Sequence, residues 1–392
     1  MNEPTDVTLR TLVEADLDAF VDLRAHTWGY HDRDATRAAQ RSHLDATLGA
    51  FDADGHLLAS AAGHQLETFV AGRRVPLLAI ASVQTVPTAR RRGLAARLLA
   101  RLLERGHEAG IGWSLLYPFD PRYYARFGWQ SLPTGVRLSL PARWWQPLAS
   151  VAAEQVRGDL RSALQPLHLR CAAGWTFTGA RTDGPWDDWD GLQPDPGRRV
   201  AAYALEDGYA VVRVRDEARQ IVTLQLIDGS WCSPAGRRNV LALLGAYRDQ
   251  VDRIELELPR DDALAWDWGD WWTSATNDTR MARVVDLPSV FAALPAPDDL
   301  PEATFAVRDR VARWNEGGWR LRPGRDGCEL EPARGSVAAT LDVRALPLLL
   351  GGAATPDAVV RAGLAEGERA PLATLAALAG GKTPYRAPAD RF

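Results

Sequence analysis

The same order of predicted elements occurs twice in this 392-residue sequence. Turns at residues 52–55 and 71–74 separate three strand-like apolar runs, and a helix and a buried strand at 113–116 follow them. Three further runs between residues 200 and 227, followed by a helix and a strand at 254–258, repeat that order. We favour a duplicated core over a chance recurrence. A duplicated core predicts two similar domains in this part of the chain, each with a sheet and a helix.

The last block of the sequence predicts a smaller domain of another kind. It begins near residue 286, and its short strands are followed by helices, an order typical of an α+β domain. We expect the strands at 304–307, 319–321, 328–330 and 338–341, and the helices at 343–350, 356–362 and 372–379. Residues 382–392 contain two prolines and no apolar periodicity, which indicates an extended tail.

Composition argues against several classes of partner. The formal charge of −4 disfavours nucleic acid and anionic membranes, since both bind a net basic surface. No apolar run approaches the roughly 20 residues of a membrane span. The N-terminus has no basic region followed by an apolar stretch, so we expect a cytoplasmic protein. The three cysteines and seven histidines lack metal-ligand spacing, and we therefore expect no metal site.

The turn over residues 82–95 carries the clearest chemical signal. A predicted strand runs through Arg-x-x-Gly-x-Ala, with Arg90, Arg91 and Arg92 before Gly93, into a helix striped with leucines. Unpaired backbone N–H groups and the positive end of the helix would surround an anion there. Forked arginine donors and the small Gly93 and Ala95 suit a pyrophosphate. The alternative is a solvated basic run in front of a helix.

This turn resembles the acetyl-CoA site of the GNAT N-acetyltransferase superfamily. Residues 123–129, Tyr-Tyr-Ala-Arg-Phe-Gly-Trp, resemble a segment of the Eis-type (enhanced intracellular survival) members, and residues 283–288 are similar to their segment before the third domain. The resemblance implies an α/β (α+β) fold of tandem GNAT-like domains, with mixed, mostly antiparallel sheets and flanking helices, plus a small α+β sterol-carrier-like domain. The implied limits are 1–145 for the GNAT domain with the acetyl-CoA site, 146–285 for a second GNAT-like domain without one, and 286–392 for the sterol-carrier-like domain and its tail.

The resemblance also implies site residues. It places acetyl-CoA contacts at the strand end, the turn and the helix start, namely at Val83, Gln84, Thr85, Arg90, Arg91, Arg92, Gly93, Leu94, Ala95 and Ala96, with Phe119 and Asp120 as further positions near the cofactor. The general acid of the family falls on Tyr124, and its general base, a terminal carboxylate, falls on Phe392. The alternative for Tyr124 is an aromatic that packs a corner, and for Phe392 a frayed chain end.

The implied activity is acetyl transfer from acetyl-CoA to a primary amine of a small molecule, either aminoglycoside-like or another amine. The helix of the second copy is preceded by residues 231–236 with no arginine, so we expect that copy to be a scaffold. The resemblance further implies a homo-oligomer, a hexamer in the family. The alternative function is a lipid- or ligand-binding protein that uses its sterol-carrier-like domain and has an inactive or regulatory GNAT domain.

Overall fold

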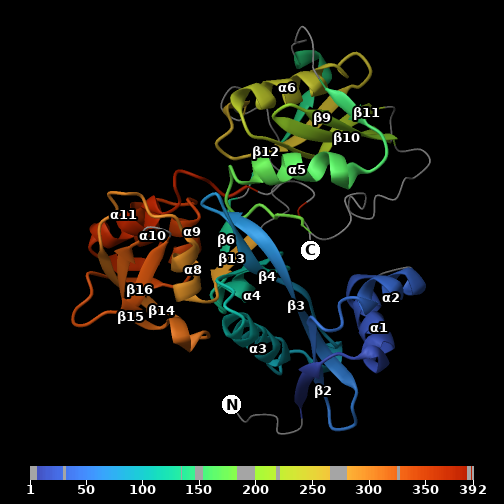
Figure 1. The fold of residues 1–392 in the computed structure, drawn as a ribbon. Helices are drawn as coiled ribbons and strands as arrows, with labels where there is room; N and C mark the ends of the chain where they lie inside the picture. Colours follow the sequence, from blue (N-terminus) through green and yellow to red (C-terminus); the bar gives the residue numbers. More distant parts are fainter. Residues whose placement is uncertain are drawn as a thin grey trace.

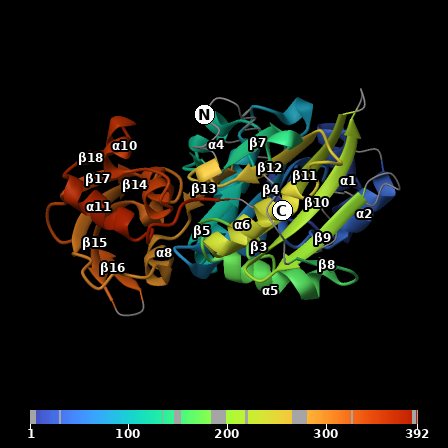
Figure 2. The same ribbon diagram turned by 90° about the horizontal axis from the view of Figure 1, so that it is seen from above.

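In a computed structural model of the protein, the described residues form three sheets, each covered by helices (Figure 1). The structure describes residues 7–29, 32–133, 135–145, 153–182, 199–217, 221–264, 280–324, 327–385 and 390. Viewed from above, the third sheet and its helices form a separate lobe beside the other two (Figure 2). Within the described residues, no helix has the length and apolar character that crossing a membrane requires.

The first sheet has seven strands in the order β1-β2-β3-β4-β5-β13-β6. Its strands are β1 (Thr8–Thr11), β2 (Thr47–Phe51), β3 (Leu57–Val70), β4 (Arg73–Thr85), β5 (Trp113–Leu116), β13 (Arg280–Val284) and β6 (Gln130–Leu132), and its helices are α1 (Leu17–Trp28), α2 (Arg33–Arg41), α3 (Leu94–Glu108) and α4 (Pro121–Ala125). The predicted leucine stripe of α3 is buried against this sheet. β4 and β5 are parallel neighbours, and the other pairs are antiparallel.

The second sheet repeats this plan. Its six strands follow the order β7-β12-β11-β10-β9-β8. They are β7 (Val136–Pro141), β12 (Arg253–Leu258), β11 (Ile221–Trp231), β10 (Gly208–Glu217), β9 (Arg199–Leu205) and β8 (Glu154–Val156), with helices α5 (Leu160–Ala172) and α6 (Pro234–Gly245). The meander β9-β10-β11 is followed by α6 and by β12 parallel to β11, as β2-β3-β4 is followed by α3 and β5. The predicted fold class is confirmed.

The first two sheets exchange strands. β7 precedes the second block in the sequence but pairs with β12 in the second sheet. β13 follows that block but lies between β5 and β6 in the first sheet. Beside each of the predicted limits at 145 and 285, one strand thus pairs in the sheet of the neighbouring block. Apolar patterning shows that a strand is buried, but not which sheet it joins.

The third unit packs on the first sheet. Its strands are β14 (Ala303–Arg308), β15 (Gly317–Pro323), β16 (Cys328–Pro332), β17 (Ala339–Asp342) and β18 (Ala365–Gly367), and its helices are α8 (Leu287–Ala293), α9 (Ala345–Leu350), α10 (Pro356–Arg361) and α11 (Arg369–Ala377). One apolar core continues from Trp113 and Val284 of the first sheet to Phe291, Phe305 and Leu346 of this unit. The third unit thus shares the core of the first.

Candidate functional site

The strands β4 and β5 separate at one end. Their parallel pairing stops at Ile80 and Leu116, whereas β4 continues to Thr85. A bulge in β4 at Ser82, with φ 51°, shifts the register against β3, and Arg24 of α1 donates a hydrogen bond to the Ser82 hydroxyl at 2.6 Å. Beyond Ile80 the backbone edge of β4 is therefore no longer paired with β5, and a ligand can approach it.

The start of α3 lies next to this opening. Arg91 and Gly93, with φ of 63° and 78°, turn the chain into the helix, which no side chain caps. The first intrahelical bond of this turn runs from the Arg97 N–H to the Gly93 carbonyl at 3.1 Å. The N–H groups of the residues between these two have no partner inside the helix, and they add to its positive end. This arrangement suits a phosphate.

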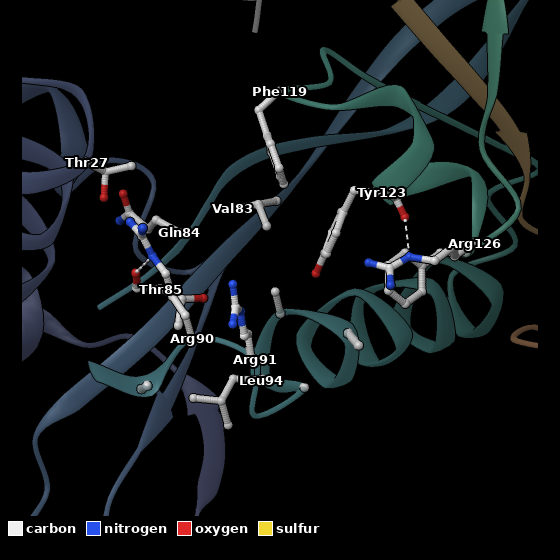
Figure 3. A pocket seen from close by; sticks show the side chains of 15 residues that line it. Thr27, Val83, Gln84, Thr85, Arg90, Arg91, Leu94, Phe119, Tyr123 and Arg126 are labelled. Atoms are coloured by element: carbon white, nitrogen blue, oxygen red, sulfur yellow. Dashed lines mark hydrogen bonds between the residues drawn. The ribbon is translucent and has the colours of Figure 1, made fainter. Parts of the chain in front are cut away.

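A cavity of about 840 Å³ connects the strand opening with the helix start (Figure 3). Its lining includes most of the predicted contact positions, namely Val83, Gln84, Thr85, Arg90, Arg91, Gly93, Leu94, Ala95, Ala96 and Phe119. Arginine side chains enter it from the turn, and none of the described lining residues is acidic. Its volume is within the usual range of small-molecule and cofactor sites. The cavity therefore has the size and the charge to hold an anionic ligand.

Four predicted residues stand apart from the described lining. Arg92 is exposed on the turn. Asp120 caps α4 by accepting a hydrogen bond from the Arg122 N–H at 2.9 Å, and its ion pair with Arg122 lowers the pKa of the carboxyl group. Tyr124 is buried behind the cavity wall. Phe392 lies outside the described residues, so its predicted role is a proposal below.

Tyr124 is packed among aromatic rings. Its ring centroid lies 5.4 Å from that of Phe119 and 5.2 Å from that of Tyr123, and both of these residues line the cavity. On its other side Trp129 lies at 6.3 Å. Burial raises the pKa of the Tyr124 phenol well above its usual value of 10. The phenol therefore keeps its proton at neutral pH, and its burial makes it a weaker acid than a phenol in water.

The cavity also contains residues to which the sequence assigned no role. Tyr123, Arg126 and Phe127 line it, and Arg126 lies over the Tyr123 ring at 4.8 Å. Arg126 and Phe127 follow Tyr123 by three and four residues. This spacing places side chains on one face of a helical turn, so it could have predicted that the three lie together. Thr27 of α1 also lines the cavity. Its position depends on how α1 packs against the sheet, and a local sequence pattern does not predict that packing.

The equivalent helix start in the second sheet is filled by the chain itself. Ser233 caps α6 by accepting from the Gly236 N–H at 3.0 Å, and its hydroxyl donates to the Asp207 carboxylate at 2.7 Å. A Cβ atom on Gly236 would lie 2.2 Å from the Asp207 carbonyl oxygen. An acidic residue thus lies at the start of α6, and it would repel a phosphate.

Comparison with protein families finds three matches along the chain. Residues 8–132 and 179–284 each match an acetyltransferase (GNAT) domain, and residues 287–387 match a sterol carrier protein domain. An uncharacterized N-acetyltransferase of Streptomyces avermitilis is 27% identical over 339 residues, which are 78% of this chain and 79% of the relative. These matches confirm the resemblance found in the sequence.

Solved structures share the fold over nearly the whole chain. A GCN5-related N-acetyltransferase from Anabaena variabilis has a TM-score of 0.83 at 19% identity, covering 97% of this chain and 99% of that one. Eis1 from Mycobacterium abscessus has a TM-score of 0.78 at 23% identity, also covering 97% of this chain and 99% of that one. The three sheets and their order along the chain are therefore common to these proteins.

Proposed function

We propose that the first domain acetylates a primary amine of a small molecule, since residues 8–132 and 179–284 each match an acetyltransferase (GNAT) domain and residues 287–387 match a sterol carrier protein domain. One observation carries this proposal. The uncapped start of α3 and the arginines of its turn face a cavity at the point where β4 and β5 separate (Figure 3). The GNAT fold implies acetyl-CoA as the acetyl donor.

The residues of the cavity fit this donor. The N–H groups at the start of α3 and the side chains of Arg90 and Arg91 would hold its diphosphate. The free edge of β4 at residues 83–85 would pair with the amides of its pantetheine arm as an added strand does. When bound, acetyl-CoA supplies an acetyl group activated as a thioester. With Asp207 at the start of α6, we expect one such site in each chain.

Two groups would move the protons of the reaction. As the amine nitrogen bonds to the acetyl carbon and the carbon–sulfur bond breaks, the Tyr124 phenol would give its proton to the departing sulfur. A carboxylate would take the proton that the amine loses, and we assign this role to the terminal carboxylate of Phe392. The tail supports that assignment, because Asp390 is bound to Tyr117, the residue that follows β5.

The described lining favours an acceptor with little positive charge. With Arg90 and Arg91 assigned to the diphosphate, Arg126 adds a further positive charge to the cavity, and the described lining offers no carboxylate to hold a polycation. We therefore expect monoamines to be better substrates than aminoglycosides. The homohexamer implied by the family is tested separately by light scattering of the purified protein.

The experiment is acetyl transfer to a panel of amines, measured as release of the CoA thiol. Tyr124→Phe should lower kcat by about 100-fold or more at an unchanged KM for acetyl-CoA. Tyr123→Phe is the matched control, since that ring lines the cavity but has no assigned proton to donate. A protein extended by a few residues after Phe392 should lose activity to a similar degree.

Each outcome decides one part of the proposal. Full activity of Tyr124→Phe would exclude its phenol as the acid, and full activity of the extended protein would exclude the terminal carboxylate as the base. If no amine is acetylated and an apolar ligand binds instead, the protein is a ligand carrier and the proposed activity is wrong.

A further inference from the structure

The side chain of Asp390 is enclosed between the first two sheets. It is 3% exposed, and its carboxylate accepts hydrogen bonds from the Gly179 N–H at 2.9 Å and from Arg181 Nε at 2.6 Å. Burial alone would raise the pKa of this carboxyl group, but the charges of Arg181 and Arg280 hold it below its usual value. Asp390 is therefore a buried, ionised residue with bonds on both carboxylate oxygens.

Arg181 is oriented for this contact by other residues. Its terminal nitrogens donate to the Asp228 carboxylate at 2.8 and 3.0 Å, and Asp228 also accepts from the Tyr209 hydroxyl at 2.9 Å. The Asp228 side chain is completely buried. The second sheet thus holds the guanidinium in place through Asp228 and Tyr209, so that Nε remains directed at Asp390.

The backbone of Asp390 is bound to the first sheet. Its carbonyl oxygen accepts from the Tyr117 hydroxyl and from Arg280 of β13 at 2.9 Å. Arg280 also donates to the Tyr117 hydroxyl at 2.8 Å, and it is 1% exposed. Tyr117 directly follows β5, and Phe119, two residues later, lines the cavity. The tail is therefore tied to the end of β5 that opens the site.

We propose that Asp390 is a positioning residue that anchors the tail between Arg181 and Arg280 and so presents the terminal carboxylate to the acetyl-transfer site. This inference rests on the proposed function, because it concerns the base assigned there. Two residues of chain span at most about 7 Å. The anchor at Asp390 would then limit how far from Tyr117 a carboxylate two residues later can reach.

The test uses variants of the full chain and two independent measurements. Asp390→Asn removes the charge bound by Arg181, and Tyr117→Phe removes one hydroxyl without a change of shape. Thr383→Ala is the control, since it deletes an exposed tail hydrogen bond to Asp261. The first measurement is the rate at which carboxypeptidase removes residues from the C-terminus, followed by mass spectrometry. The second is kcat and KM for acetyl-CoA.

We expect Asp390→Asn to be trimmed at least about tenfold faster than the native protein, because a buried guanidinium loses its partner. We expect kcat to fall by about 10-fold to 100-fold with KM for acetyl-CoA unchanged, as for a misplaced catalytic group. Tyr117→Phe should change both quantities in the same direction, and Thr383→Ala should change neither. A merely structural role would lower the melting temperature without separating kcat from KM.

The outcomes distinguish this inference from the proposed function. Equal trimming of Asp390→Asn, Tyr117→Phe and native protein would overturn the anchor, whether or not any amine is acetylated. Faster trimming with an unchanged kcat would overturn the positioning role. A native protein that acetylates no amine contradicts the proposed function, and the trimming rates then still decide whether Asp390 anchors the tail.

Discussion

The Arg283 guanidinium donates hydrogen bonds to both carboxylate oxygens of Asp309, at 3.0 and 2.8 Å, and neither side chain is more than 1% exposed. Arg283 belongs to β13 of the first sheet, whereas Asp309 follows β14 of the third unit. This buried pair joins the acetyltransferase domain to the sterol carrier protein domain across their shared core.

Removing the charge of Asp309 should destabilise both domains together. Asp309→Asn keeps the shape and an oxygen that can accept from the Ala312 N–H, but it leaves the Arg283 guanidinium buried without a counterion. Loss of one partner of a buried pair costs about 3 kcal/mol or more of folding free energy. Urea unfolding followed by tryptophan fluorescence measures it. Glu302→Gln, in the exposed pair with Arg320, should leave the midpoint nearly unchanged, and equal effects of the two variants would contradict the prediction.

Gly128 illustrates how closely the same guanidinium is packed. A Cβ atom at Gly128 would lie 1.9 Å from Arg283 Nη1, and φ is 89°. Gly55, with φ 83° and open space around the Cβ position, is the matched control. Gly55→Ala should cost only the backbone strain of about 1 kcal/mol. Gly128→Ala should cost about 2 kcal/mol more, because Arg283 must move. Equal losses in urea unfolding would show that the contact has no energetic weight.

The parts of the site that could be predicted from the sequence are contiguous in the chain. The arginine turn, Gly93 and the leucines of α3 follow one another closely in the chain. Their spacing in the sequence is therefore enough to predict how they are arranged around the start of the helix. The Tyr123–Phe127 segment is equally local. The turn and its helix needed only helical periodicity and the chemistry of an uncapped helix start, whereas the Tyr123–Phe127 segment was noted only through its resemblance to a family segment.

The remaining features depend on contacts between distant residues. Asp390 binds Gly179, which lies 211 positions earlier, and Arg280 binds Tyr117 across 163 positions. The exchange of β7 and β13 between the sheets is of the same kind. Such pairings are chosen by the packing of the whole chain, and neither apolar periodicity nor a local motif distinguishes them from alternatives.

Arg91 and Arg92 of the turn should differ in how strongly they affect KM for acetyl-CoA. Arg91 lines the cavity, whereas Arg92 is exposed beside it. Arg91→Gln should raise KM for acetyl-CoA about tenfold, the loss expected for a hydrogen bond to a charged group. The effect should shrink at high salt, since charge is involved. Arg92→Gln should leave KM within about twofold of the native value. A larger effect at Arg92 than at Arg91 would reverse their proposed roles.

The protonation of His168, which lies next to the tail anchor, depends on the pH of the solution. It is fully buried, its Nε2 donates to the Gly179 carbonyl at 2.7 Å, and its Nδ1 lies 3.0 Å from the Tyr209 hydroxyl. Burial and the charge of Arg181 lower the pKa of His168 from 6.5 to about 4. The same Gly179 donates its N–H to Asp390, so a charge on His168 would disturb the anchor.

Stability should therefore fall as the pH drops from 6.5 to 4. Above pH 6.5 the imidazole is neutral in both states, whereas between the two pKa values only the unfolded chain binds the proton. The loss is complete below pH 4 and amounts to about 3 kcal/mol. His168→Gln should flatten urea midpoints measured from pH 7.5 to 4.5, while His56→Gln, whose side chain is 76% exposed, should keep the native slope. The same slope in native protein and His168→Gln would mean that His168 does not cause the acid sensitivity.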